Sequence, residues 1–293
     1  YQFLNYAKVR KVEIDQDQSK KKTSKKKKKK ERSPSEEAAA SKGENVFDAK
    51  SSYRAYSRMH CSFVFPEDIP RPYPGDDESN MTDDFNEEVL DSQESIDISD
   101  IEDETTSELK EKEELKLRMK RYEVEKNKTL RKLDRLKDNF LTMDVSDKLL
   151  KYSPKYNTIV NKIAELTQDA KHLGTAFVYT EYKTLEGIAV FSIILKANGY
   201  APFLLDKNER GEWIQKFESD EDINKPKYAF WGGDAAQSDI IRKVYNNDFD
   251  ELPKSLVDQF NGLKVNNLRG NIIKVLMTTK SGAEGIDLHN VRQ

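Results

Sequence analysis

The sequence is poor in the residues on which secreted and membrane proteins depend. It contains a single cysteine, Cys61, which excludes an internal disulfide framework and suits a reducing compartment. No apolar run approaches the roughly 18 residues that span a bilayer, and no charged-then-apolar secretion signal begins the chain. We therefore expect an intracellular protein with no membrane partner.

Apolar residues are scarce throughout. They make up 36% of the 293 residues, and charged residues make up 35%, whereas an ordinary globular chain has roughly 45–50% and about 25%. This deficit is too large for one uniformly folded domain, so part of the chain should be solvated. The sequence begins at Tyr1 rather than at a methionine and stops at Gln293 inside a recognisable pattern, so we expect a piece of a longer protein.

Charge occurs in blocks of one sign. The net charge of −3 arises from 50 basic and 53 acidic side chains, with nine lysines in residues 20–30 and 14 acids without a lysine or arginine in residues 76–104. Such runs repel themselves and bury no apolar area, which predicts a basic disordered segment over 1–50 and an acidic disordered insertion over 76–106. The lysine run suits a nucleic-acid contact or a localisation signal, and a solvated spacer explains it equally well.

The sequence predicts packed structure between and after these blocks. Residues 51–75 form a connector that is rich in aromatic and apolar residues until several prolines end regular structure. Residues 107–150 form a charged helical region, because 107–142 carry no proline or glycine and their apolar residues recur at roughly helical spacing. Ser153 and Pro154 are then typical of a helix N-cap and first turn.

Residues 151–293 have the pattern of an α/β domain. Short apolar runs predict buried strands, and they lie at 175–180, 200–205, 228–231 and 271–279. Helical segments separate them, one from a cap at Thr184 through Ala197 and one around 238–245. This alternation predicts a mostly parallel sheet with helices on both faces.

Two polar loops follow predicted strands, where parallel sheets place their functional residues. The first contains Thr180 and Thr184, and the second combines Thr279, Lys280 and Ser281. Hydroxyl groups, a lysine and unpaired backbone N–H groups at a helix start together favour an anion such as a phosphate.

Glycines and an acid complete the second loop. Gly282 and Gly285 would let the backbone approach a ligand closely, and Asp287 is an acceptor of the type that holds ribose hydroxyls. An ordinary turn and capped helix would account for the same spacing.

Four segments resemble superfamily 2 helicases, in the family's order. Residues 275–293, VLMTTKSGAEGIDLHNVRQ, resemble motif V, and residues 176–200 resemble the strand and helix of motif IV. Residues 153–166 are similar to the Ser-x-Lys helix that precedes motif IV in Swi/Snf-type members. Residues 52–66, followed by Arg-Pro, resemble the connector after the first motor domain in helicases of large cytoplasmic DNA viruses, a group that includes relatives of the poxviral early transcription factor small subunit.

The resemblance implies that 151–293 is a second RecA-like domain, truncated before motif VI. The residues that it implies for nucleic-acid binding are Thr180, Thr184, Thr279, Lys280 and Ser281. Those that it implies for nucleotide binding are Gly285 and Asp287. The implied partners are DNA or RNA phosphates and the first RecA-like domain of the parent chain, with viral RNA polymerase as a further candidate.

The catalytic parts of such a motor are missing. A Walker A loop needs a Gly-Lys-Ser/Thr sequence, and the chain contains no Gly-Lys pair. The arginine of motif VI, which stabilises transferring phosphoryl charge, would begin after Gln293. We therefore assign no catalytic residue and no metal site, and expect ATP and Mg²⁺ to bind the intact parent protein and not this piece alone. His60 and Cys61 are interpreted as packed rather than metal-binding.

The leading interpretation is part of a viral ATP-dependent helicase or translocase, acting in the host cytoplasm or in the virion. An ATPase subunit of a viral transcription factor and a non-catalytic interaction scaffold are the alternatives. Trp213 and Trp231 could stack on bases, although Trp231 lies in a predicted strand and is better explained as core.

Overall fold

The computed structural model describes residues 1–2, 4–11, 55–73, 106–143, 147–168, 173–279 and 286–291. Residues 4–11 are helical, whereas the lysine run and the acidic insertion lie outside the described residues. The chain divides into two compact units. One comprises Tyr1–Cys61 and Pro70–Lys128, and the other comprises Ser62–Ile69 and Thr129–Gln293. None of the described helices is long and apolar enough to cross a membrane.

The first unit contains helix α2 (Ala55–His60) and most of the 30-residue helix α4 (Thr106–Arg135). The side chain of Gln2 donates a hydrogen bond to the carbonyl oxygen of His60 at 2.9 Å. His60 is buried, as predicted, but Cys61 is exposed because it lies in the turn that directly follows α2. The prediction that both are packed was therefore wrong for Cys61.

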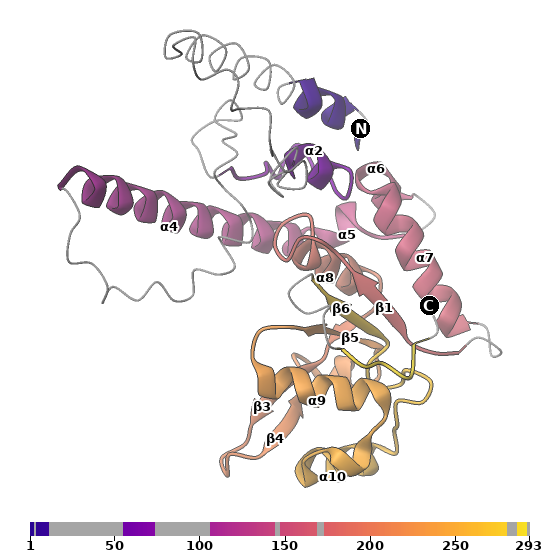
Figure 1. The fold of residues 1–293 in the computed structure, drawn as a ribbon. Coiled ribbons are helices and arrows are strands. Elements are labelled where there is room, and N and C mark those ends of the chain that lie inside the picture. The colour runs from indigo at the N-terminus through magenta and orange to yellow at the C-terminus, as the bar shows by residue number, and fades with distance from the viewer. Residues whose placement is uncertain are drawn as a thin grey trace, which may run out of the picture. The chain divides into compact units, whose positions relative to one another are not determined.

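The second unit is built on a four-stranded parallel sheet (Figure 1). Its strands are β1 (Ala176–Tyr179), β6 (Val275–Thr278), β5 (Lys227–Trp231) and β2 (Ala201–Pro202), in that spatial order. All three pairings are parallel. The α/β fold class with a mostly parallel sheet, predicted from the short apolar runs, is confirmed and is consistent with a RecA-like domain.

Helices cover the two faces of this sheet. Helix α8 (Ile188–Ala197) connects β1 to β2, while α9 (Ala235–Asn246) and α10 (Lys254–Leu263) connect β5 to β6. The first connection runs across the sheet in one direction and the second runs back in the other. Because parallel crossovers are right-handed, the two connections lie on opposite faces.

The core between the sheet and α9 is the best defined apolar cluster. It joins Ala229 of β5 and Leu276 of β6 to residues of α9 and α10, such as Val244 and Phe260, which are fully buried. Helix α9 reaches this core because its buried residues recur at helical spacing, and it begins where the Asp234 carboxylate accepts the Gln237 N–H at 2.8 Å. Such an N-cap contributes about 1 kcal/mol.

Three helices precede the sheet: α5 (Lys137–Phe140), α6 (Lys148–Tyr152) and α7 (Pro154–Gln168). The predicted cap of α7 is confirmed, because the Ser153 hydroxyl accepts the Tyr156 N–H at 2.9 Å. The connector residues Ser62–Ile69 belong to this unit, and Val64 donates its N–H to the carbonyl oxygen of Tyr152 at 3.0 Å. Part of the predicted connector is therefore packed with the α/β domain.

One predicted strand divides in two. The run 200–205 was expected to be a single strand, but β2 ends at Pro202 and Leu204–Lys207 forms β3, which pairs antiparallel with β4 (Trp213–Lys216). The chain reverses at a turn closed by a hydrogen bond from the Gly211 N–H to the Asn208 carbonyl oxygen at 2.8 Å. The hairpin packs on α10, where Gln259 and Gln215 exchange two hydrogen bonds of 2.9 Å.

Candidate nucleic-acid interface

The two predicted ligand loops begin side by side. Strands β1 and β6 are neighbours in register, with Tyr179 opposite Thr278. The Thr180 N–H donates to the carbonyl oxygen of Thr278 at 3.1 Å, which extends the pairing one residue beyond β1. Thr180 and Thr279 therefore leave the sheet together at its carboxyl edge.

At this edge the connections that follow two neighbouring strands leave the sheet on opposite faces. After β1 the chain turns to α8 on one face, while Ile286, Leu288 and Val291, which come after β6, pack against the core cluster on the α9 face. Val291 then forms a parallel bridge with Thr175 on the outer side of β1. Adjacent strands whose connections leave to opposite faces open a crevice at their carboxyl ends, which is the usual ligand site of open α/β sheets.

The hydroxyl groups at this edge differ in access. Thr180 is half-buried, and its Oγ1 accepts the Tyr182 N–H at 3.4 Å. Thr279 is only 5% exposed, and Thr278 is fully buried and donates its hydroxyl to the Trp231 carbonyl oxygen at 3.0 Å. Burial therefore places Thr180 ahead of Thr279 as a group that could meet a phosphate directly.

Thr184 does not cap a helix, contrary to the sequence-based expectation. Helix α8 begins at Ile188 with Gly187 as its N-cap, and Thr184 lies in the preceding turn. The Ile188 and Ala189 N–H groups donate to the carbonyl oxygens of Tyr182 and Lys183 at 3.0 and 3.1 Å. Because the loop itself occupies these donors, the helix start offers no unpaired amides to a phosphate, and a role for Thr184 would depend on its side chain.

Gly187 makes this tight loop feasible. A Cβ atom at this position would lie 1.7 Å from the carbonyl oxygen of Tyr182. Any larger residue would therefore have to move the backbone between β1 and α8.

Asp287 lies apart from the threonines. Its carbonyl oxygen accepts a hydrogen bond from the Asn246 side chain at 2.9 Å, and Asn246 is the last residue of α9. Since α9 starts after the carboxyl end of β5 and packs back along the sheet, Asp287 is held towards the amino edge. Its carboxylate is exposed and has His289 Nδ1 at 3.6 Å. Lys280, Ser281 and Gly285 lie outside the described residues.

The two tryptophans that could have stacked on bases belong to the core instead. Trp213 and Trp231 are half-buried and pack against the α9 cluster. The Lys207 ammonium lies 4.8 Å from the centroid of the Trp213 ring and covers it by a cation–π contact. Tyr179 begins the first predicted loop but was given no role from the sequence, and it is 51% exposed at the end of β1.

The amino edge carries two buried lysines that the sequence analysis also missed. Lys227 and Lys274 are each 3% exposed. Lys227 Nζ donates to the carbonyl oxygens of Ile223 and Lys225 at 2.9 Å, and burial lowers its pKa to about 8. Lys274 Nζ donates to the carbonyl oxygens of Leu166 and Arg269 at 2.9 and 3.3 Å, and burial lowers its pKa as well.

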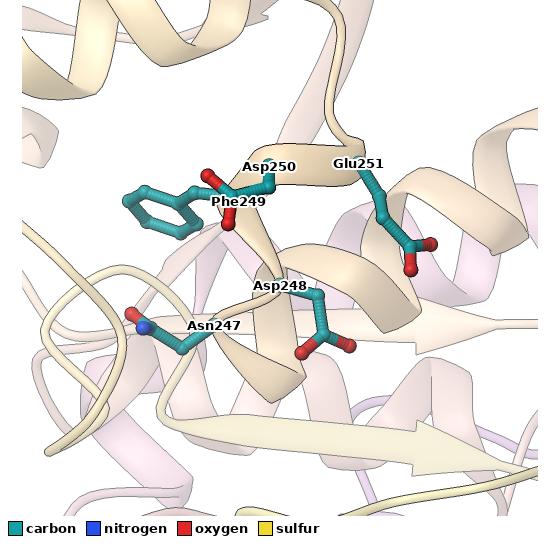
Figure 2. Close-up of a pocket in the computed structure, with 5 residues that line it drawn as sticks. All are labelled: Asn247, Asp248, Phe249, Asp250 and Glu251. Carbon is teal, nitrogen blue, oxygen red and sulfur yellow. The ribbon is translucent and has the colours of Figure 1, made fainter.

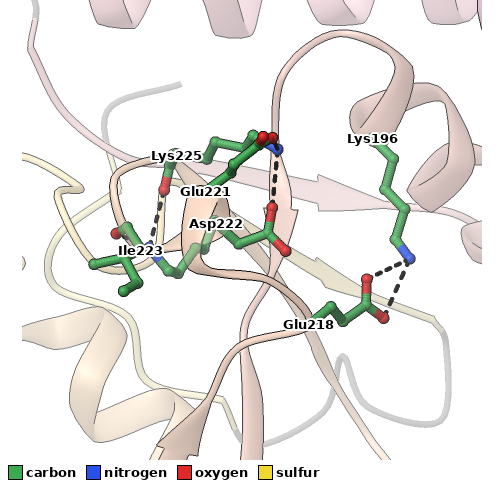
Figure 3. A network of polar contacts seen from close by, with 7 residues as sticks. Lys196, Glu218, Glu221, Asp222, Ile223 and Lys225 are labelled. Carbon is green, nitrogen blue, oxygen red and sulfur yellow. Dashed lines mark hydrogen bonds and ion pairs between the residues drawn. The ribbon is translucent and has the colours of Figure 1, made fainter.

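Ion pairs surround this edge (Figure 3). Lys196, in the last turn of α8, lies 3.0 Å from Glu218, and Lys225 lies 2.9 Å from Asp222. The hydrogen bond from Lys225 lowers the pKa of Asp222, whose residue is only 8% exposed. Asp222 is buried because it lies in the 3₁₀ helix Asp220–Ile223, which turns its side chain inwards.

A separate hollow of about 390 Å³ lies at the end of α9 and is lined by Asn247–Glu251 (Figure 2). Three of its five residues are acidic, namely Asp248, Asp250 and Glu251, and the Lys243 ammonium lies 3.6 Å from the Glu251 carboxylate. Carboxylates repel phosphate. The hollow is therefore a poor candidate for nucleic acid, and the β1–β6 edge is the better one.

Comparison with known proteins gives one distant relative. Over 269 residues the chain is 25% identical to a protein of Acanthamoeba polyphaga mimivirus described as a "putative ATP-dependent RNA helicase". The match covers 82% of this chain and 28% of that protein. No family model and no solved structure matches.

This similarity relates the chain distantly to a viral protein described as an ATP-dependent helicase. It covers 82% of the chain and therefore extends beyond any single motif. Because the chain spans little more than a quarter of the length of that relative, the activity of the whole relative is not carried over to it.

Proposed function

We propose that this chain is the second motor domain of an ATP-dependent nucleic-acid helicase or translocase. The proposal rests on one observation: Thr180 and Thr279 lie next to each other at the carboxyl ends of β1 and β6, where the connections leave to opposite faces. Open α/β sheets bind their ligands at such a position. The helicase relative and the order of the helicase-like motifs support it.

In this proposal Thr180 donates its hydroxyl to a phosphate oxygen of the bound strand. The neighbouring Thr279, Lys280 and Ser281 would contact the same phosphate backbone. Thr184 would add a contact through its side chain. Hydroxyl-to-phosphate contacts position a strand without reading its sequence, so binding should be weakly sequence-selective.

ATP and Mg²⁺ would be bound by the parent protein, between this domain and the first RecA-like domain. Gly285 and Asp287 would face the ribose there, and the exposed Asp287 carboxylate suits a hydrogen bond from a sugar hydroxyl. When bound, ATP would supply the free energy of phosphoryl transfer. This chain's own residues would hold the nucleotide and the strand.

The track is proposed to be RNA, because the distant relative is described as an RNA helicase. The proposed place of action is the host cytoplasm or the virion. An ATPase subunit of a viral transcription factor would use the same residues on DNA, so both nucleic acids belong in the test.

The test is fluorescence anisotropy of labelled single-stranded RNA and DNA with the 293-residue chain and its Thr180→Ala/Thr279→Ala variant. We expect the variant to bind about tenfold or more weakly, because hydrogen bonds to charged groups contribute roughly 1.5–3 kcal/mol. Thr158→Ala is the matched control, since Thr158 is exposed on α7 and its hydroxyl donates to the Pro154 carbonyl oxygen.

Salt dependence separates this contact from the lysine run. A neutral hydroxyl releases no counterion, so the slope of log affinity against log salt should not change in the double variant, whereas lysines set that slope. Equal affinities for the double variant and for Thr158→Ala would contradict the proposed site. Sustained ATP hydrolysis by the chain alone would contradict its assignment as a motor half without a phosphate-binding loop.

A further inference from the structure

Tyr179 is the only exposed phenylalanine, tyrosine or tryptophan among the side chains that the structure describes. It is 51% exposed and stands at the last position of β1, immediately before Thr180. We propose that Tyr179 stacks on a base of a single strand whose backbone lies across the β1–β6 edge. This inference rests on the proposed function and assigns to that site a contact that a duplex with paired, stacked bases could not make.

The register of the sheet fixes where Tyr179 points. Tyr179, Thr278 and Trp231 form one row across β1, β6 and β5. Two residues earlier, Phe177, Leu276 and Ala229 form a row that packs into the α9 core. Because side chains alternate along a strand, Tyr179 lies on the same face as this core and continues it beyond the last covered row.

The residues in the row of Tyr179 are buried to different extents. At one side Trp231 packs against the core, and in the middle Thr278 is fully buried. At the other side half of the Tyr179 surface remains in water, where an aromatic side chain loses the burial that normally stabilises it. An aromatic face at the edge of a ligand crevice is the kind of group on which a base stacks, and every base has a face that fits.

The charges near Tyr179 also favour base stacking over binding of the strand by ion pairs. The loop that follows Tyr179 carries one lysine, Lys183, and two acids, Glu181 and the buried Glu186. No basic cluster is therefore available in residues 179–187 to hold the strand by charge alone. Thr180 next to Tyr179 would meet the phosphate backbone while the ring meets a base, so adjacent residues would contact two parts of one strand.

The experiment uses the 293-residue chain and two labelled oligonucleotides of equal length and charge. One is oligo(dT), and the other carries abasic sites at the same positions. Tyr179→Ala should weaken binding to oligo(dT) about 5- to 150-fold, the loss that corresponds to roughly 1–3 kcal/mol per stacked base. Tyr179→Phe should retain the affinity, because it keeps the ring.

The abasic strand isolates the effect. Both strands carry the same phosphates, which are the groups that the threonines and the lysine run would contact, so Tyr179→Ala should leave affinity for the abasic strand unchanged. Leu268→Ala is the control for loss of an exposed apolar side chain, since Leu268 is 59% exposed in a turn before β6. It should change neither affinity.

The outcomes distinguish the two proposals. Binding of oligo(dT) by the wild type with no loss in Tyr179→Ala, or with equal losses on both strands, would overturn the stacking role and leave the proposed function standing. Failure of the wild type to bind either strand would overturn the stacking role, and failure to bind single-stranded RNA as well would overturn the proposed function. Weakening on oligo(dT) alone, with rescue by Tyr179→Phe, is the result that supports the inference.

Discussion

The two edges of the same sheet are built in opposite ways. At the amino edge the buried polar side chains Lys227, Lys274 and Asn267 are bonded to backbone groups. At the carboxyl edge Tyr179 is half in water and Thr180 is half-buried. The amino edge therefore stabilises the domain, whereas the carboxyl edge leaves side chains accessible to a ligand.

The difference follows from the topology. The ends of α7 and α9, the loop before β5 and the turn before β6 bring backbone carbonyl oxygens to the amino edge, namely those of Leu166, Tyr245, Ile223, Lys225 and Arg269. Buried carbonyls need donors, and lysine and asparagine side chains supply them. At the carboxyl edge the connections that follow β1 and β6 leave to opposite faces, so variants at this edge should change binding more than stability.

Asn267 should be the most sensitive position of the amino edge. This fully buried side chain donates to the Tyr245 carbonyl oxygen and accepts the N–H groups of Ile272 and Ile273, at 2.7–3.0 Å. Asn267→Ala leaves these groups unpaired, at roughly 1–3 kcal/mol for a buried group. We expect the free energy of unfolding of this unit to fall by about 3 kcal/mol.

Urea denaturation followed by tryptophan fluorescence measures this loss in the right unit. The chain has two tryptophans, and both Trp213 and Trp231 lie in the second unit. The neighbouring variant Asn266→Ala is the control, because Asn266 is exposed and its side chain accepts only the Leu268 N–H at 3.2 Å. Similar midpoints for the two variants would mean that the amino edge is not held as described.

Gly187 is an exception at the carboxyl edge, because this position does not tolerate a larger side chain. Gly187→Ala would put a Cβ 1.7 Å from the Tyr182 carbonyl oxygen, and overpacking of this kind costs about 1–3 kcal/mol. The loop that holds Thr180 should shift, so both stability and nucleic-acid affinity should fall. Gly262→Ala, in α10 with no atom within 4 Å of the added Cβ, should be neutral or gain up to about 1 kcal/mol. A Gly187→Ala variant with wild-type stability and affinity would contradict the claim that the loop between β1 and α8 requires glycine at this position.

Much of the fold could be predicted because burial leaves a pattern in the sequence. Apolar runs marked β1, β5 and β6, and Ser153-Pro154 marked the start of α7. The site could be predicted in part: loops after parallel strands share an edge, which placed Thr180 and Thr279 together before any coordinates. The role of each residue at that edge stays a prediction.

Other features left no such signal. Lys227 and Lys274 are indistinguishable in sequence from surface lysines, since only the folded chain brings carbonyl oxygens to their ammonium groups. The division of 200–205 depends on pairing with Trp213–Lys216, a non-local event. The exposure of Tyr179 could not be read from a run that otherwise indicates a buried strand.

Lys227 gives the smallest and most specific test of the amino edge. Burial lowers its pKa from 10.5 to about 8. Between these values the unfolded chain keeps the proton and the folded chain releases it, so unfolding takes up a proton and the free energy of unfolding rises with pH. The rise attributable to Lys227 should approach about 1 kcal/mol per pH unit, and it should be absent in Lys227→Met.

Subtraction of the two pH profiles isolates this group. The free energies of unfolding of the wild type and Lys227→Met should be compared between pH 7 and 9.5, again by tryptophan fluorescence. Burial raises the pKa values of Tyr228 and Tyr245, so both tyrosines would oppose the trend only near pH 10 and above, where the unfolded chain begins to ionise. Lys216→Met is the control, because Lys216 is exposed and pairs with Asp206 at 2.9 Å. If the profiles of the wild type and Lys227→Met stay parallel, then Lys227 remains charged in the folded protein, and the amino edge is better solvated than its geometry indicates.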